Sequence, residues 1–197
     1  MNIFALDSNP VKAAIQHSDY HVISQLKEGV QIMCTVVHLL GCGTPNLCAP
    51  THPDHPSVRW ALVRADNFHW LYQLVFALNS EYRMRYGKTK DHNSMWQADE
   101  ASAIYEKQIG WREGMTAWPQ VMPAAFQRPI GNEVTARHVG DAHPSVQAYR
   151  AYYATDKRTL RGKPVSWTGR STPSWFENQN ADLSAAFETT AEAVAGW

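Results

Sequence analysis

The chain has 197 residues, with 18 Lys and Arg against 18 Asp and Glu, so the overall charge does not by itself indicate a nucleic-acid partner. The length fits one domain, or one domain with an appendage, and allows a substantial core. Three cysteines do not suggest the disulfide framework of a secreted protein, no apolar run reaches membrane-spanning length, and the N-terminus lacks the pattern of a signal peptide. We therefore expect a cytoplasmic protein with no membrane partner.

The first half of the chain predicts helices separated by one long loop. Pro10 is suited to the first turn of a short helix, and a longer helical pattern runs from Asp19 to Leu40. Residues 41–55 are rich in proline and glycine and predict a loop. A further helical pattern extends from 56 to 86, with Asp66 marking a restart after a break.

The second half is more irregular. Residues 92–109 predict a weaker helix, and the prolines within 118–132 predict an extended or irregular segment. His143-Pro144-Ser145 introduces another short helix. We therefore predict an all-α fold: a single helical domain over residues 1–176 with long irregular Pro/Gly-rich connections, and an acidic helical C-terminal tail over 177–197.

The helix predicted from Asp19 to Leu40 carries two stripes at helical spacing. The apolar stripe predicts a core-facing side and consists of Val22, Leu26, Val30, Met33 and Val37. Beside it lies a polar stripe made of His21, Ser24 or Gln25, Glu28 and Gln31. Covered polar groups need partners, so this stripe is either a structural hydrogen-bond network or part of a site. The rest of the chain offers no stronger catalytic motif, and we favour the site.

The loop residues 51–56, Thr-His-Pro-Asp-His-Pro, look like metal ligands at first sight. Cys42 and Cys48 lie nearby, but their spacing is wider than the usual pairs of a zinc site. We therefore predict no metal site. The alternatives are a rigid turn that caps the following helix, or a loop in which His52 or His55 supplies an imidazole to the polar stripe.

Basic residues gather where the helix over 56–86 is predicted to end. Gly87-Lys88-Thr89 is not a phosphate loop, because Tyr82 stands where that motif requires glycine and because phosphate loops use helix N-termini. The cations Arg83, Arg85 and Lys88 either complement the helix dipole or contact an anion.

A third set of residues interleaves aromatic and basic side chains near the C-terminal end of the predicted domain. It comprises Tyr149, Arg150, Tyr153, Lys157, Arg158, Arg161, Lys163 and Trp167. Such a pattern suits a nucleic-acid backbone with bases stacked on aromatic rings. The alternative is a helix that packs its tyrosines on the core and leaves its charges in solvent.

Several blocks of the sequence together resemble a group of small phage-encoded proteins. The resemblance covers most of residues 1–176. The residues that carry it are MNIF with Asp7, Pro10, Ala13 and Ala14; Asp19, His21, Val22, Glu28 and Gln31; THPDHPS with Trp60; Asn67, Trp70 and Leu71; RYGKT; PQVMP; and AYRAYY followed by Trp175.

The group resembles the phage enzymes of thymine hypermodification, in particular the amino acid:DNA transferases. This resemblance implies an all-helical enzyme that acts on double-stranded DNA in which 5-hydroxymethyluracil is activated as a pyrophosphate ester. A free amino acid such as glycine would be the second substrate, and no cofactor is expected. The family pattern has lysines near positions 20 and 24, where this chain has Tyr20 and Ser24. An anionic group held by those lysines would be held differently here.

The chemistry implied by the resemblance assigns roles to the residues above. A general base is needed for the amine, and the catalytic set is His21, Glu28, Asp7 and His55. Stabilisation of the leaving pyrophosphate falls to Gln31, Arg83, Arg85, Lys88 and His52. The aromatic and basic set at 149–167 would grip the DNA. Two alternatives remain: a DNA glycosylase or lyase on a modified or damaged pyrimidine, and a non-enzymatic phage protein that binds DNA or another protein.

Overall fold

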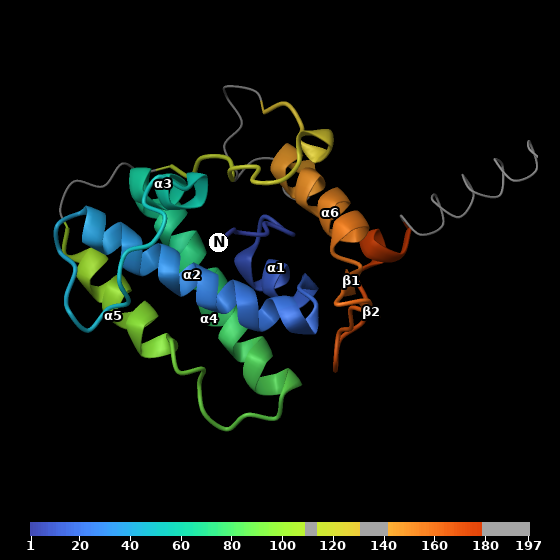
Figure 1. The fold of residues 1–197 in the computed structure, drawn as a ribbon, viewed down its shortest axis with the longest axis horizontal. Helices are drawn as coiled ribbons and strands as arrows, with labels where there is room; N and C mark the ends of the chain where they lie inside the picture. Colours follow the sequence, from blue (N-terminus) through green and yellow to red (C-terminus); the bar gives the residue numbers. More distant parts are fainter. Residues whose placement is uncertain (109–113, 131–141, 179–197) are drawn as a thin grey trace, which may run out of the picture.

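The computed structural model describes residues 1–108, 114–130 and 142–178, and helices dominate this part of the chain (Figure 1). The predicted all-α class is confirmed. The elements are α1 Pro10–Gln16, α2 Asp19–Leu39, α3 Pro56–Val63, α4 Ala65–Arg85, α5 Met95–Glu106, the 3-10 turn η1 Ala124–Phe126, α6 Pro144–Asp156, β1 Thr159–Leu160 and β2 Lys163–Pro164. None of the helices described is both long and apolar enough to cross a membrane. The tail predicted at 177–197 lies almost wholly outside the described residues.

Three helices begin with the same local arrangement. Asn9, His55 and His143 each accept a hydrogen bond from a backbone N–H of the turn that follows, and a proline occupies the next position. The side chain satisfies a donor that the helix leaves unpaired, and the proline ring presets the helical φ without losing a needed N–H. These local signals explain why α1, α3 and α6 begin where the sequence predicted.

The long helices α2 and α4 pack directly against each other and form the centre of the fold (Figure 1). The approach is closest at Gly29, where an added Cβ would lie 2.4 Å from Cγ2 of Val75. Helix α1 packs on α4, while α3 and α5 both contact α2 and α4. The predicted apolar stripe of α2 is buried, which confirms its side as the core side; it consists of Val22, Leu26, Val30, Met33 and Val37.

The chain after α6 returns to the start of α2. Strands β1 and β2 form a small antiparallel hairpin, which the sequence did not predict because two residues per strand leave no alternating pattern. The segment that follows reaches α2, where the backbone N–H of Asp19 donates to the carbonyl of Ser166 at 2.8 Å. This return places the hairpin beside the first turn of α2.

Candidate functional site

His21 lies in the first turn of α2 and is 8% exposed. Its Nδ1 lies 2.6 Å from the hydroxyl oxygen of Tyr153 on α6 and 3.1 Å from Oγ of Ser18. Burial, and after it the positive charge of Lys157, lower the pKa of His21 from 6.5 to about 4. The ring is therefore neutral at pH 7.

Nδ1 of His21 lies within hydrogen-bond distance of two hydroxyls, those of Tyr153 and Ser18, and the two hydroxyl oxygens lie 2.9 Å apart. In the tautomer with a hydrogen on Nδ1, the ring donates to the Tyr153 oxygen and the Tyr153 hydroxyl donates to Oγ of Ser18. The lone pair of that tautomer lies on Nε2, and His21 is then a neutral base.

The next two turns of the polar stripe hold the N-terminal segment of the chain. Glu28 accepts hydrogen bonds from the backbone N–H of Asn2 at 2.7 Å and from Nε2 of Gln25 at 3.2 Å. The Gln25 carbonyl oxygen accepts from the backbone N–H of Phe4 at 3.1 Å. The structural-network interpretation is therefore correct for part of the stripe. The Glu28 side chain nevertheless keeps 30% of its surface exposed, so one carboxylate has both a structural partner and access to solvent.

Asn2 in turn connects α2 with α6. Its Oδ1 accepts from the Tyr149 hydroxyl at 3.0 Å, and its Nδ2 donates to the carbonyl of Val121 at 2.8 Å. The same hydroxyl oxygen lies 2.6 Å from the carbonyl oxygen of Pro119, so its one hydrogen is shared between these two acceptors. The irregular Pro-rich segment is thereby fixed against the N-terminal segment, which itself contacts Gln25 and Glu28 of the polar stripe.

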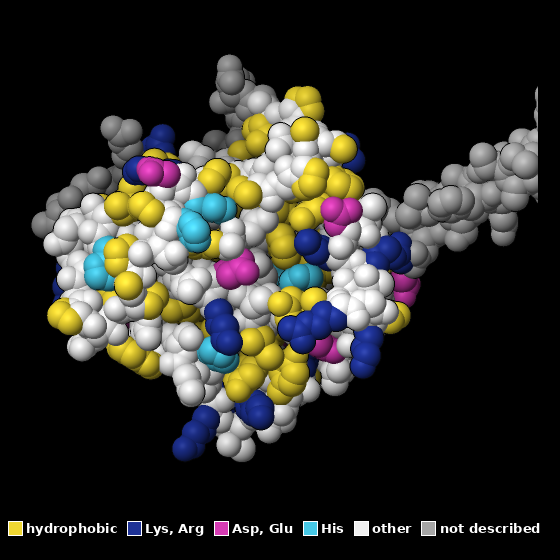
Figure 2. Space-filling view, viewed as in Figure 1, with side chains coloured by type: hydrophobic (Ala, Val, Ile, Leu, Met, Phe, Trp, Pro, Cys, Tyr) yellow, Lys and Arg dark blue, Asp and Glu magenta, His cyan; other side chains and the backbone are white. Residues whose placement is uncertain are grey.

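Figure 2 shows how the charged side chains are distributed over this face. Histidine and acidic side chains lie over α2 and α3, and Lys and Arg side chains, with a few acidic ones among them, gather beside them over the end of α6 and the β1–β2 hairpin. The stripe on α2 therefore borders a basic surface.

The histidine loop contributes mainly a helix cap. Nδ1 of His55 accepts the Ser57 N–H at 3.2 Å, so the capping interpretation is confirmed. Burial, then the charge of the N-terminal amino group and of His52, lower the pKa of His55, which places its ring near the N-terminus that Glu28 also approaches. His52 is exposed, with a left-handed φ of 48°. Within residues 1–108, 114–130 and 142–178, no three His, Cys, Asp or Glu side chains gather as a metal ion would require.

Asp7 belongs to a different group of contacts from His21. Its carboxylate accepts from the backbone of Asn9, from Nε2 of Gln16 at 3.1 Å and from Arg150 at 3.4 Å. Asp7 is buried, and Arg150 also donates to the carbonyl of Leu6 at 2.7 Å. These contacts fix the turn before α1, so the structure supports a structural role for Asp7 and Arg150 rather than the catalytic and DNA-binding roles expected.

The other predicted anion contacts separate into two kinds. Gln31 and Lys88 are exposed, and Arg83 forms a solvent-exposed ion pair with Asp91 at 3.3 Å. Arg85 is different, because its guanidinium is fully covered.

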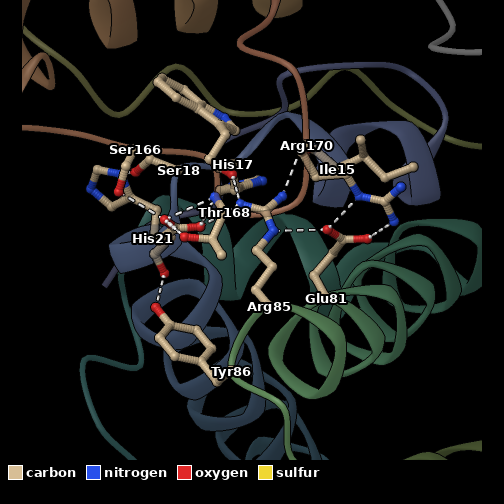
Figure 3. Close-up of polar contacts among 12 residues, drawn as sticks. Ile15, His17, Ser18, His21, Glu81, Arg85, Tyr86, Ser166, Thr168 and Arg170 are labelled. Atoms are coloured by element: carbon tan, nitrogen blue, oxygen red, sulfur yellow. Dashed lines mark hydrogen bonds and ion pairs between the residues drawn. The ribbon is translucent and has the colours of Figure 1, made fainter.

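Arg85 is the centre of a buried polar network (Figure 3). It donates to Glu81 at 2.9 Å, to Asp19 at 3.1 Å and to the carbonyls of Ile15 and His17. These donors already have partners inside the protein, which supports a structural role for Arg85 rather than the expected anion contact. The arginine instead ties α1, α2 and α4 together.

The aromatic residues expected to stack on DNA are also in the core. Tyr149 and Tyr153 are fully buried, and Trp167 is nearly so, with its indole N–H donating to the carbonyl of Gln16 at 2.9 Å. Covered rings are not available to bases, so the alternative interpretation, tyrosines packed on the core, is correct for them.

Apart from Arg150, the basic residues of the same set lie at the surface. Lys157 lies over the ring of Tyr152, and Arg158 lies over the ring of Phe176. Arg161 and Lys163 are exposed in the β1–β2 hairpin. The cationic half of the prediction therefore has the accessibility that DNA binding requires.

Sequence patterns missed the residues that hold the site together. The role of Tyr153 as the hydrogen-bond partner of His21, and those of Ser18 and Asn2, depend on contacts between distant segments that no local spacing encodes. Gln25 was detectable, since it lies between His21 and Glu28 on the polar stripe.

Comparisons with protein-family models, with curated proteins and with solved structures find no match to this chain.

Proposed function

We propose that this protein is a phage DNA base-modifying transferase that joins an amino acid, through its amino nitrogen, to a pyrophosphorylated 5-hydroxymethyluracil in DNA. The observation that carries the proposal is the state of His21: a neutral imidazole, held at Nδ1 by Tyr153, on a stripe of α2 that borders a cationic surface. The family resemblance of the sequence supplies the substrate.

The proposed reaction needs a base and a stabilised leaving group. The amine lone pair attacks the methylene carbon on C5 of the uracil, a C–N bond forms, and the C–O bond to pyrophosphate breaks. Pyrophosphate leaves with the bonding electron pair, and the extra proton on nitrogen passes to Nε2 of His21. The products are a secondary amine on the base, free pyrophosphate and one proton.

Lys157 supports this role by its effect on His21. Its charge is one cause of the low pKa of the imidazole. A pyrophosphate group bound at Lys157 would cancel that charge and add negative charge near the ring. Both effects raise the pKa of His21, so the imidazole becomes a stronger base when the activated substrate is present.

Glu28 is the proposed contact for the incoming amino acid. Its partly exposed carboxylate lies on the same stripe as His21, two helical turns away, and matches an ammonium group in charge. Its bonds from Asn2 and Gln25 hold it in place. DNA would lie on the cationic surface formed by the end of α6 and the hairpin.

Transfer is tested by incubating the protein with DNA that contains pyrophosphorylated 5-hydroxymethyluracil and each common amino acid, followed by mass spectrometry of the nucleosides. The proposal predicts an amino-acid adduct whose rate falls by about 100-fold or more in His21→Gln. Glu28→Gln keeps an acceptor for Asn2 but removes the charge, so it should raise the KM for the amino acid. Lys107→Gln, an exposed lysine at the end of α5, is the control.

The alternatives give different results in the same assay. A glycosylase or lyase would release a base or be trapped on DNA by borohydride as a Schiff base. A non-enzymatic binder would hold DNA without changing it. Absence of an adduct with every amino acid refutes the proposal.

A further inference from the structure

A small cleft lies beside the candidate site, between the first turn of α2 and the β1–β2 hairpin. Its volume is about 280 Å³, and its lining includes Tyr20, Leu160, Arg161, Lys163, Pro164 and Val165. Pockets that enclose whole drug-sized ligands are usually about 300–1,000 Å³, so this cleft suits one flat ring with its substituents rather than a large ligand.

The hairpin turn shows an unusual choice of residue. Arg161 has a φ of 51° and Gly162 a φ of 78°, so both central residues of the two-residue turn are left-handed. Asn-Gly is the preferred pair for such a turn, because a residue with a long side chain is disfavoured in this conformation. Arginine therefore occupies the position at a cost in stability. Its side chain lines the cleft, and residues in strained backbone conformations are often found at binding sites.

Tyr20 provides an aromatic wall that the core does not use. It is 47% exposed, in contrast to the buried tyrosines of α6. Its ring centroid lies 5.3 Å from that of His21, in an edge-to-face arrangement. A base stacked on Tyr20 would therefore be a near neighbour of a base presented to His21.

The charges of the lining match a phosphodiester. Arg161 and Lys163 are basic, and none of the described residues that line the cleft is acidic. The nearest acid in the sequence, Asp19, already accepts hydrogen bonds from Ser166, Thr168 and Arg85. A planar aromatic surface next to two cations is the combination by which proteins hold single-stranded nucleic acid.

We infer that this cleft binds one nucleotide of a DNA strand next to the nucleotide presented to His21, with the base on Tyr20 and the phosphodiester between Arg161 and Lys163. The inference rests on the proposed function for its DNA substrate and extends it by naming the subsite. Such a subsite would hold the strand while the modified base is turned out of the stack.

Binding of a fluorescent oligothymidylate to the full chain tests this subsite, with an abasic strand of the same length as the second probe. Tyr20→Ala should weaken oligothymidylate binding by about 5- to 100-fold and abolish the preference over the abasic strand, whereas Tyr20→Phe should retain both. Arg161→Asn should weaken both probes and lower the slope of log affinity against log salt by about one. Lys107→Gln is the matched control on a distant helix.

Arg161→Asn also separates the subsite from a loss of fold. Asn-Gly is the better turn, so the midpoint of urea unfolding should stay the same or rise while affinity falls. The inference is overturned if the wild type does not bind oligothymidylate, if Arg161→Asn binds as the wild type does, or if Tyr20→Ala still prefers thymidine. If these binding effects are observed but no amino acid is transferred, the proposed function is refuted, whereas the nucleotide-binding subsite is still supported.

Discussion

Nδ1 of His21 and the hydroxyl oxygen of Tyr153 lie 2.6 Å apart, although 132 positions separate the two residues in the sequence. The contact joins the first turn of α2 to α6, and Ser18 completes it from the residue before α2. The orientation of the candidate base thus depends on the docking of α6. The proposed function therefore predicts that stability and activity are coupled at this point.

The first prediction concerns the hydroxyl of Tyr153. Tyr153→Phe leaves the buried N–H of Ser18 without its partner and leaves Nδ1 of His21 with Oγ of Ser18 alone, so the free energy of unfolding should fall by about 1–3 kcal/mol. Transfer should slow by about tenfold or more, because the ring is no longer held in one orientation. Urea unfolding and single-turnover kinetics measure the two effects. Tyr152→Phe is the control on the same helix, and equal losses in both variants would contradict the prediction.

The second prediction is a dependence of stability on pH. Burial, opposed by a hydrogen bond with Ala13 and reinforced by the charges of His21 and Arg85, lowers the pKa of His17 to about 3, and the pKa of His21 is about 4. The unfolded chain binds these protons near pH 6.5, and the folded protein does not. Both residues therefore stabilise the fold fully above pH 6.5, and this contribution is lost as the pH falls toward 4. The slope should be about 1.4 kcal/mol per pH unit for each histidine.

Urea unfolding at several pH values between 7 and 4 measures this slope. His17→Gln keeps a donor for the carbonyl of Ala13 but removes the titrating ring, so it should flatten the dependence by about one histidine's share. A slope that is unchanged in this variant would show that His17 is charged in the folded protein.

The third prediction distinguishes the two arginines at the end of α4. Arg85→Met leaves Asp19 without its cation and Glu81 with only the partly exposed Arg170, and it should cost about 3–5 kcal/mol of stability. Arg83→Met breaks only an exposed ion pair with Asp91 and should cost about 0–1 kcal/mol. Thermal and urea unfolding of the pair provide the measurement. Similar losses in both would contradict the structural role of Arg85.

Local signals in the sequence were sufficient to predict where helices begin, but not which charged and aromatic side chains are buried. The caps and prolines at Asn9 and His55 act over one turn, so the starts of α1 and α3 were predictable. Arg85 and Tyr153 are buried, but an arginine or a tyrosine can face either solvent or the core, so the residue type alone does not predict this. Only the packing of α4 and α6 decides that, because their partners come from segments far away in the chain. Basic and aromatic patterns alone therefore do not indicate which of these side chains are accessible at the surface.

The last prediction tests the contact between α2 and α4 at Gly29. Helix propensity favours alanine over glycine by about 1 kcal/mol, so Gly29→Ala would stabilise an isolated helix. In the folded protein the new methyl group would lie 2.4 Å from Cγ2 of Val75, and one of the two helices must move. Overpacking of this kind costs about 1–3 kcal/mol, so we expect a net loss of stability in urea unfolding.

A second substitution shows whether the clash is the cause. Val75→Ala removes the methyl groups that the new Cβ would meet. In that background Gly29→Ala should cost nothing or stabilise the protein by up to about 1 kcal/mol, so the double-mutant cycle should give a favourable coupling energy. If Gly29→Ala costs the same with either residue at position 75, the helices do not approach each other there as closely as the structure has them. If the coupling is present, the glycine is explained by the packing of α4 against the helix that carries His21 and Glu28.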